Sequence, residues 1–417
     1  MTSRLTVIVP TRERADTLVS SLRTCTTQDC DELAILVSDN ASTDSTREVV
    51  ASHDDPRIRY VNPGRRLGMS EHWEFALSHV DDGYVSFLGD DDGLMPGAAS
   101  ELLEVLDSES ADALIWPLSS YYWPQFFDPA MANCLSMRLP QEGRLTRLDS
   151  ARTLAQVARF ETPHYFLPSP YWGAVHRSCL TRMGRGGRVF GSIIPDVYSG
   201  VGVAAVTTSY LRSDRLYSLS GSSRHSNGAS QMTGKDKSSV DSPAAMFEAE
   251  NALPFHPRLD YTTNVAVLVA ECLLQAHDQV SAAVPLPELD TMFRAAVRHP
   301  DHVLSPAVQA GVEESLRRTA ARHGHEAILD RELRTGHRRA LARRASAALR
   351  LIVLGNPLHD CEPDGVADIY GATVVADRLR TAHSSALART TWTVRGRALK
   401  AGRALSAARA RSGPANA

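Results

Sequence analysis

The sequence predicts an α/β protein with a mostly parallel sheet flanked by helices, followed by a mainly α-helical C-terminal region. Three observations support this. In residues 5–118, continuous apolar runs alternate with amphipathic segments. A Gly/Ser-rich stretch, residues 218–243, then interrupts the pattern. Beyond about residue 245, Ala, Leu, Arg and Glu dominate and strand signals are few.

Five apolar runs in the first part have the length and composition of strands. An uninterrupted apolar run is typical of a parallel strand that is buried on both faces. The expected strands are residues 5–10, 33–40, 58–62, 83–89 and 111–118. The segments between them carry apolar residues at helical spacing. They predict helices over residues 15–24, 43–53, 71–80 and 96–106.

The rest of the chain divides by composition. Residues 119–170 are rich in aromatic residues and proline, which suits loops that line a cleft. We expect a first α/β domain over residues 1–228, because the Gly/Ser-rich stretch is the best candidate for a domain boundary. A Gly/Ser-rich linker or lid loop over residues 229–245 and a mainly helical region over residues 246–417 should follow.

Cysteine usage and hydropathy favour a cytoplasmic protein. The six cysteines form no C-x-x-C pair, and no histidine lies at zinc-site spacing from them, so reduced thiols are expected. The first ten residues contain too short an apolar run for a signal peptide. No stretch reaches the roughly 18 apolar residues that a membrane span needs.

Charge is segregated along the chain. From Arg378 onward there are nine cationic residues and no acidic one, although the whole chain has a formal net charge of −3. A nucleic-acid-binding protein usually carries positive charge on its folded body, so no nucleic-acid partner is expected. The tail, with Trp392, Val394, Leu399 and Leu405 opposite its arginines, suits peripheral contact with an anionic membrane. A solvated helix or a partly disordered end remains the alternative.

Polar segments follow three of the expected strands. They are "VPTRER" after the first, "VSDNASTD" after the second and "LGDDDG" after the fourth. The carboxyl ends of parallel strands meet at one edge of a sheet, where ligands bind. The acidic run suits Mg²⁺ or Mn²⁺, which prefer oxygen ligands and often also hold substrate phosphates. A solvated turn is the alternative.

Four blocks of sequence resemble the inverting family 2 glycosyltransferases of GT-A fold over roughly residues 1–228. They are "VIVPTRERADTL", "VSDNASTDST", "NPGRRLGMSEHWEFAL" and "FLGDDDGLMP", in that order and at similar spacing. The resemblance implies that several residues bind a nucleotide-sugar donor: Pro10, Thr11, Arg14, Asp39, Arg66 and Asp90. Asp39 would accept a hydrogen bond from the base, and Asp90 would contact the ribose or sugar. Asp39 as a loop cap and Arg14 as a surface charge are the alternatives.

The resemblance also implies a metal site and a general base. Asp91 falls at the position of the metal ligand, with Asp92 as a helper and His225 as an extra ligand. The first acid of the common D-x-D form is replaced by Gly89. Asp196 falls where the base is expected, although it follows Pro195 where the family often has Glu. A helix cap is the alternative role for Asp196, and an ordinary loop residue that for His225.

The resemblance implies an enzyme that moves a sugar from a nucleoside-diphosphate donor, UDP favoured, to a glycan, lipid-linked or small-molecule acceptor. Mn²⁺ or Mg²⁺ would be the cofactor, and a homo-oligomer is a further expectation. Two rivals remain: a catalytically silent binding or assembly subunit, and a nucleotidyltransferase. The latter would need a Gly-rich G-x-G-x-x-x-R opening, which "PTRERADT" lacks.

Overall fold

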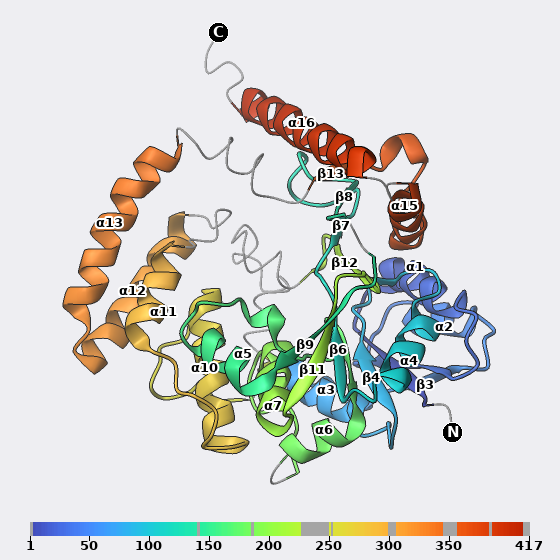
Figure 1. Ribbon diagram of the computed structural model, residues 1–417, viewed down its shortest axis with the longest axis horizontal. Coiled ribbons are helices and arrows are strands. Elements are labelled where there is room, and N and C mark those ends of the chain that lie inside the picture. Colours follow the sequence, from blue (N-terminus) through green and yellow to red (C-terminus); the bar gives the residue numbers. More distant parts are fainter. Residues whose placement is uncertain are drawn as a thin grey trace.

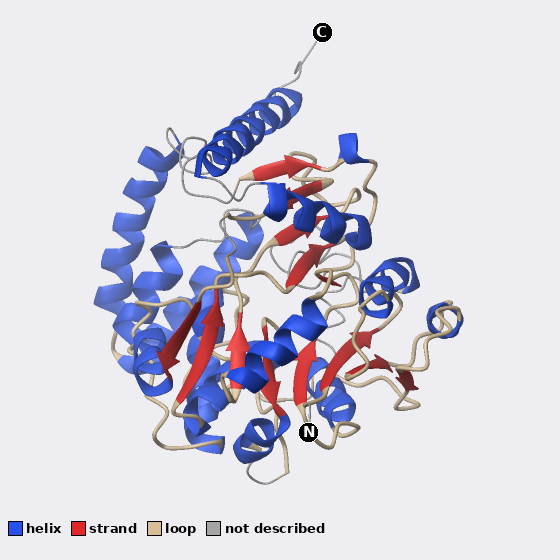
Figure 2. Cartoon of the chain, turned by 45° about the vertical axis from the view of Figure 1, so that its right-hand side comes forward, coloured by secondary structure: helices blue, strands red, loops and turns tan. Residues whose placement is uncertain are grey.

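The computed structural model describes residues 3–139, 142–184, 187–226, 250–251, 253–298, 306–344, 357–382 and 386–411. It contains two sheets, seen as separate groups of strands in Figure 2. Helices α10 to α13 lie to one side of the larger sheet, and α15 and α16 lie beside the smaller one (Figure 1). The Gly/Ser-rich segment expected over residues 229–245 lies outside the described residues.

The larger sheet has eight strands in the order β3-β2-β1-β4-β10-β6-β11-β9. Their bounds are β1 Leu5–Thr11, β2 Leu33–Asp39, β3 Ile58–Val61, β4 Tyr84–Phe87, β6 Ala113–Ile115, β9 Leu145–Asp149, β10 Gly173–His176 and β11 Ser209–Ser213. Strands β3, β2, β1 and β4 are parallel, whereas β10 runs antiparallel to β4 and β6, and β9 runs antiparallel to β11. The parallel part predicted from the apolar runs is therefore confirmed.

Helices cover both faces of this sheet because β1 is apolar on both. Val7 and Val9 face one hydrophobic core, and Ile8 faces another. The first core includes apolar residues of α1 and α4, and the second those of α3, α6 and α7. The helices and the 3₁₀ turn of this part are α1 Ala15–Thr26, α2 Thr46–Ala51, α3 Met69–Leu77, α4 Ala98–Ser108, α5 Ser150–Ala158, η1 His164–Phe166, α6 Arg177–Met183 and α7 Pro195–Val206.

The smaller sheet corrects two expectations. Its strands, in the order β13-β8-β7-β12-β5, are β13 Leu358–Asp360, β8 Cys134–Ser136, β7 Ser120–Tyr122, β12 Ser218–Ser222 and β5 Gly93–Leu94. Residues 119–170, expected to be loops, thus contain β7, β8, β9 and α5, and the expected Gly/Ser-rich loop begins with β12. These strands are short and partly polar, so backbone pairing with distant strands forms them and local hydrophobicity gives little signal.

The C-terminal region is mainly helical, as predicted. Its helices are α10 Val265–Gln279, α11 Leu289–Arg298, α12 Pro306–His323, α13 Glu326–Arg344, α15 Ile369–Ala382 and α16 Ala386–Arg411, with the 3₁₀ turn η2 Glu362–Asp364. Helix α10 packs on α7, and α15 packs on α1. Apolar residues of both helices share the two cores of the large sheet. The division into domains at residues 228 and 246 stays a prediction.

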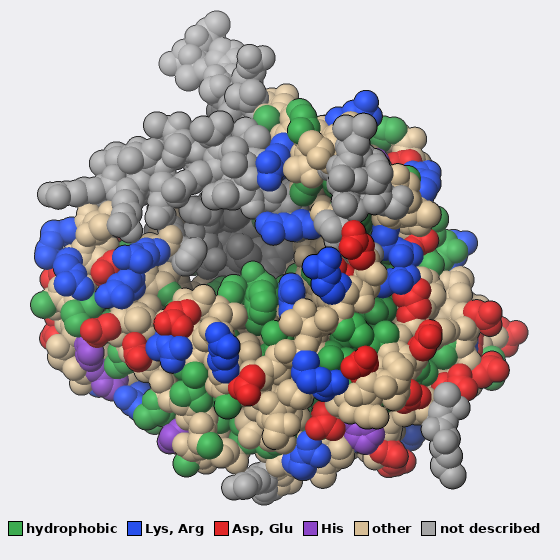
Figure 3. All heavy atoms as spheres, in the orientation of Figure 1, with side chains coloured by type: hydrophobic (Ala, Val, Ile, Leu, Met, Phe, Trp, Pro, Cys, Tyr) green, Lys and Arg blue, Asp and Glu red, His purple; other side chains and the backbone are tan. Residues whose placement is uncertain are grey.

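Helix α16 turns a different face outward than its sequence suggests. Trp392 is buried and stacks on His359, with ring centroids 5.5 Å apart, whereas Val394 on the same predicted face is 62% exposed. Arg403 points inward and pairs with Asp360 at 2.8 Å. Within the described part of the chain, no helix is long and apolar enough to cross a membrane. On the face in Figure 3, basic and acidic side chains of described residues are interspersed.

Candidate functional site

The polar segments that follow β1, β2 and β4 converge at one edge of the large sheet. Thr11 and Asp39 are register partners at the ends of β1 and β2, and β4 leads directly into Asp90, Asp91 and Asp92. We call these three residues the aspartate turn. All three are buried, with exposed fractions of 2%, 5% and 5%, so each carboxylate needs specific partners.

Asp90 is held by the turn that follows β1. Its Oδ2 accepts a hydrogen bond from the Thr11 hydroxyl at 2.8 Å, and its Oδ1 forms an ion pair with Arg14 at 2.8 Å. Burial raises the pKa of Asp90, while Arg14 opposes that shift. The structure thus brings together Thr11, Arg14 and Asp90, three residues assigned to the donor from sequence.

Asp91 faces the segment after β12. Its Oδ2 accepts hydrogen bonds from the hydroxyls of Ser223 and Ser226, both at 2.6 Å, and its backbone carbonyl accepts one from Trp123 Nε1 at 3.1 Å. Gly221 makes this approach possible, since a Cβ there would lie 1.7 Å from the Asp91 carbonyl oxygen. The sequence did not reveal these contacts of Asp91, because they depend on the position of β12, which was not predicted.

Asp92 is the most enclosed of the three. Its Oδ2 accepts from the Gly89 N–H at 3.0 Å and from the Tyr171 hydroxyl at 3.0 Å, and its Oδ1 accepts from the Gly221 N–H at 2.6 Å. Burial and the neighbouring Asp91 raise the pKa of Asp92 to about 7. A Cβ at residue 89 would lie 2.7 Å from Asp92 Oδ2. Since Asp92 occupies the space that a side chain there would need, residue 89 is glycine and not the acid of the common motif.

The oxygen-rich surroundings of Asp91 fit a divalent cation. No hydrogen bond reaches Asp91 Oδ1 from the residues described, and Oδ2 meets only serine groups. Within that same part of the chain, no group of three or more His, Cys, Asp or Glu side chains could hold a metal. One carboxylate plus substrate phosphates is a common arrangement for Mg²⁺, which keeps several waters. Asp91 therefore suits such an ion, whereas both oxygens of Asp92 are already bonded.

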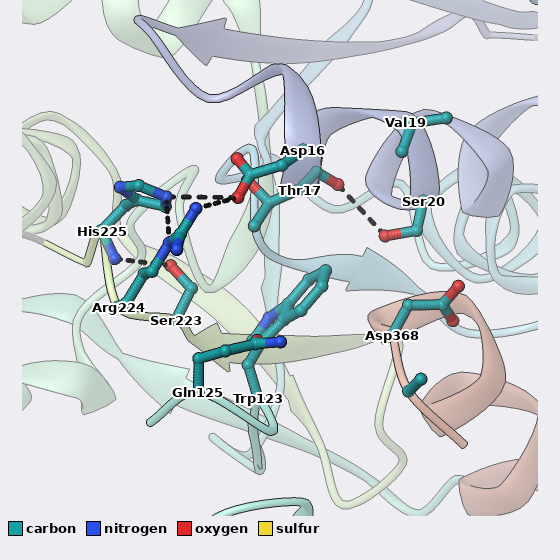
Figure 4. A pocket seen from close by; sticks show the side chains of 11 residues that line it. Asp16, Thr17, Val19, Ser20, Trp123, Gln125, Ser223, Arg224, His225 and Asp368 are labelled. Carbon is teal, nitrogen blue, oxygen red and sulfur yellow. Dashed lines mark hydrogen bonds and ion pairs between the residues drawn. The ribbon is translucent and has the colours of Figure 1, made fainter. Parts of the chain in front are cut away.

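His225 lies beside the aspartate turn but points elsewhere. Its Nε2 is 3.2 Å from Asp16 Oδ2 and accepts a hydrogen bond from Arg224 at 2.8 Å (Figure 4). These residues line a cavity of about 300 Å³ between α1, the segment after β12 and the start of α15. The His225 backbone carbonyl accepts a hydrogen bond from Arg14. The imidazole therefore lies with Asp16 in this structure.

Asp196 stands at the start of α7, directly after Pro195 in the first turn. No side chain among the described residues hydrogen-bonds to its carboxylate. The residue as a whole is partly accessible to solvent. Burial nevertheless raises the pKa of Asp196 to about 6, against the stabilising N–H groups of the helix start. The Tyr171 hydroxyl donates to Asp92 and lies within electrostatic range of Asp196 and Asp91. Asp196 and the aspartate turn therefore both act electrostatically on this tyrosine.

The remaining predicted donor residues lie at the β1 and β2 ends. Asp39 Oδ2 accepts from the Tyr60 hydroxyl at 2.5 Å, and its Oδ1 accepts from the Ser42 N–H at 3.0 Å, which caps the loop. Pro10, the last but one residue of β1, pairs with Ser38. Asp39 therefore caps its loop and also lies at the edge of the sheet where the polar segments converge.

Arg66 belongs to a charged network above this edge. Its guanidinium pairs with Glu13 at 2.8 Å and lies 3.9 Å from Glu250, which also pairs with Arg12. A Cβ on Gly68 would lie 2.6 Å from the Glu250 carbonyl oxygen. The chain at residue 250 therefore lies close to this edge of the sheet, a contact that the sequence does not reveal.

This fold defines an α/β domain of the GT-A type. Residues 6–167 match the family model described as glycosyl transferase family 2. The resemblance drawn from the four sequence blocks is thereby confirmed, since all four lie within the match. Asp196 and the segment after β12 lie beyond it.

Two relatives align with part of the chain. The chain is 38% identical over 104 residues to the GalNAc(5)-diNAcBac-PP-undecaprenol beta-1,3-glucosyltransferase of Campylobacter jejuni, covering 24% of this chain and 34% of that protein. It is 24% identical over 144 residues to the succinoglycan biosynthesis protein ExoO of Rhizobium meliloti, covering 34% and 39%. The chain therefore spans well under two thirds of either relative.

Solved structures with a similar overall course of the chain include two that contain nucleotide sugars. TarS residues 1–349 of S. aureus with UDP-GlcNAc has a TM-score of 0.43 at 14% identity, covering 80% of this chain and 90% of that one. The mannosyltransferase PcManGT of Pyrobaculum calidifontis with GDP-Man and Mn²⁺ has a TM-score of 0.41 at 15% identity, covering 98% and 88%.

Proposed function

We propose that the chain is an inverting glycosyltransferase that moves a sugar from a nucleoside-diphosphate donor, with UDP favoured, to an acceptor hydroxyl. The observation that carries this proposal is the position of Asp196. Its carboxylate has no side-chain partner among the described residues, its pKa is raised to about 6, and it lies within electrostatic range of Tyr171, whose hydroxyl donates to Asp92. A carboxylate without a side-chain partner and with a pKa near neutral pH suits a general base.

The donor would lie along the carboxyl ends of β1, β2 and β4. Pro10 and Thr11 form the end of β1, Asp39 the end of β2, and the ion pair of Arg14 with Asp90 lies beside them. Arg66 supplies a further guanidinium at the same edge. Guanidinium groups bind phosphate oxygens through several N–H donors, which suits a diphosphate. Asp90 would then orient the ribose or the sugar.

Asp91 would hold Mn²⁺ or Mg²⁺, with Ser223 and Ser226 as neighbouring hydroxyl groups. A bound divalent cation supplies positive charge that stabilises the negative charge gained by a departing diphosphate. Asp92 would keep the turn in place, because its carboxylate bonds to Gly89, Gly221 and Tyr171. His225 stays a candidate additional ligand only if its imidazole leaves Asp16.

The transfer would be a single displacement. One carboxylate oxygen of Asp196 takes the proton of the acceptor hydroxyl, and the acceptor oxygen bonds to the anomeric carbon on the face opposite the diphosphate. The bond between that carbon and the diphosphate oxygen breaks, and its electron pair remains on the diphosphate. The configuration at the anomeric carbon is inverted as a result.

A lipid-linked glycan is the favoured acceptor, because the name of the C. jejuni relative includes PP-undecaprenol. A cytoplasmic location with peripheral membrane contact would fit such an acceptor and stays a prediction, as does a homo-oligomer. Other glycans and small molecules stay alternative acceptors.

The test is a panel of nucleotide sugars, including UDP-glucose, UDP-N-acetylglucosamine and GDP-mannose, each with Mn²⁺ or Mg²⁺. Donor hydrolysis and nucleotide binding are both measured. At least one donor should bind in a metal-dependent way and be hydrolysed, and Asp196→Asn should keep binding while losing about 100-fold or more of the hydrolysis rate. Binding of a donor without turnover would favour the silent subunit. An Asp196→Asn variant that works at the normal rate would exclude Asp196 as the base.

A further inference from the structure

The turn that precedes Asp196 is tied to the C-terminal helical region. Residues 191–195 lead into α7, and Ile194, with φ −113° and ψ 81°, is the last residue before the helix. Because Asp196 is the second residue of α7, the conformation of this turn sets where the helix begins. It therefore also sets the direction in which the Asp196 carboxylate points.

Ser192 is the residue that organises this turn. Its hydroxyl accepts a hydrogen bond from the Ile194 N–H at 3.3 Å and donates one to Glu271 Oε2. Its backbone carbonyl accepts a hydrogen bond from the Ser70 hydroxyl at 2.5 Å. Ser192 is fully buried, so these contacts are shielded from water. A single serine thus connects α3, α10 and the start of α7.

Glu271 lies in the middle of α10 and is fully buried, with Ser192 and Gln275 among the polar groups near its carboxylate. Its Oε1 has no hydrogen-bond partner within the part of the chain that the structure describes. Burying a carboxylate with incomplete hydrogen bonding is costly, and a leucine in its place would pack without that penalty. Burial also raises the pKa of Glu271. A core helix has no packing reason to carry this residue, which indicates a role beyond packing.

A second contact from α10 reaches the same turn. Gln279 Nε2 donates a hydrogen bond to the Gly191 carbonyl at 3.3 Å, and a Cβ on Gly191 would lie 1.9 Å from Gln279 Oε1. Helix α10 also packs directly on α7. The turn is therefore held from one side by two polar side chains of α10, two helical turns apart.

We propose that Glu271 is a positioning residue for Asp196: through the Ser192 hydroxyl it holds the turn at residues 191–195 in the conformation that aims the Asp196 carboxylate into the site. This inference rests on the proposed function for its catalytic meaning. It assigns the attached helical region a direct part in the reaction, since α10 belongs to that region. It also predicts that Glu271 and Ser192 act as one unit.

The first test measures hydrogen exchange and needs no turnover. The variants are Glu271→Leu, Glu271→Gln and Ser192→Ala, with Asn264→Ala as the matched control. Asn264 caps the same helix, accepting a hydrogen bond from the Ala266 N–H at 3.0 Å, and does not touch the turn. Glu271→Leu and Ser192→Ala should each raise amide exchange in a peptide spanning residues 191–197 by about tenfold. Glu271→Gln, whose amide oxygen can still accept the serine hydrogen bond, and Asn264→Ala should leave that peptide unchanged.

The second test measures kinetics with whichever of UDP-glucose, UDP-N-acetylglucosamine or GDP-mannose is hydrolysed. Glu271→Leu should lower kcat by about 10- to 100-fold with KM for the donor nearly unchanged, because small misplacements of a catalytic group have effects of this size. Glu271→Gln should recover most of kcat. The double variant of Glu271→Leu with Ser192→Ala should be no slower than the worse single variant, as expected of residues that act through one contact.

The outcomes separate this proposal from the proposed function. If no donor is hydrolysed by the unaltered protein, the enzyme proposal fails, and the exchange result alone decides whether Glu271 holds the turn. If the unaltered protein is active and Glu271→Leu keeps its kcat, the positioning role is wrong. It is also wrong if Asn264→Ala lowers kcat as much as Glu271→Leu does at equal loss of thermal stability, because a general weakening of α10 would then explain both.

Discussion

Replacing Asp196 by Asn should stabilise the protein while abolishing its activity. The native structure raises the pKa of Asp196 from its ordinary 3.8 to about 6, mainly by burial. Ionised Asp196 is therefore less favourable in the folded protein than in the unfolded chain. At about 1.36 kcal/mol per pH unit, the difference corresponds to roughly 3 kcal/mol of lost stability at neutral pH. Asn resembles the protonated acid in size and polarity, so the variant should recover most of this free energy.

Because the pKa of Asp196 is raised on folding, the stability of the protein depends on pH. Between about pH 4 and 6 the folded protein holds a proton at Asp196 that the unfolded chain has lost, so stability falls as the pH rises through this window. Below about pH 4 the carboxyl is protonated in both states and the penalty vanishes. The difference in free energy of unfolding between Asp196→Asn and the unaltered protein should be near zero at pH 4. It should reach its full value above about pH 7.

The assay is denaturant unfolding of both proteins from pH 4 to 8, combined with the pH dependence of donor hydrolysis. A base with a pKa of about 6 is roughly 9% ionised at pH 5 and 91% at pH 7, so kcat/KM should rise about tenfold over that interval. A stability difference that does not change with pH, or a variant that is less stable at pH 7, would show that the Asp196 carboxylate is not held in an unfavourable environment.

Three further substitutions probe the aspartate turn. Gly221→Ala places a Cβ 1.7 Å from the Asp91 carbonyl oxygen, so it should prevent the small sheet from forming and lower Tm strongly. The control is Gly402→Ala, which should leave Tm nearly unchanged because no atom lies within 4 Å of the added Cβ. Arg14→Met leaves the buried Asp90 carboxylate without its ion pair and should cost about 3 kcal/mol in denaturant unfolding; an unchanged midpoint would mean that Asp90 finds another partner. Tyr171→Phe removes one hydrogen bond to the last aspartate of the turn and should cost about 1 kcal/mol. That loss should be greater at pH 8 than at pH 5, since the removed hydroxyl stabilises the ionised carboxylate.

The parallel half of the large sheet was predictable because its signals are local. Strands such as β1 and β2 are buried on both faces, so each reads as one continuous apolar run. The helices between them carry apolar residues at helical spacing, as α4 does with Leu102, Leu103 and Leu106. The motif blocks add the positions of the donor edge. None of these features depends on which distant segment packs nearby.

The small sheet was not predictable in the same way. Strand β12 is the polar sequence Ser218–Ser222, and its pairing with β5 and β7 comes from segments about 100 residues upstream. Strand β13 pairs with β8 across more than 200 residues of chain. Backbone pairing of this kind leaves little trace in the local sequence, because most of the stabilisation comes from the partners.

The sequence by itself determined the α/β class, the family resemblance and the presence of three adjacent acids after β4. Alignment with the family motif assigned different roles to these acids, but it could not show which partners each carboxylate has. Only the tertiary structure supplied those partners: Asp90 pairs with Arg14, Asp92 is enclosed by Tyr171 and Gly221, and Asp91 alone keeps a carboxylate oxygen without a hydrogen bond from the described residues. The physical reason is that a buried carboxylate takes its character from its partners, and those partners lie some 80 to 130 residues away along the chain.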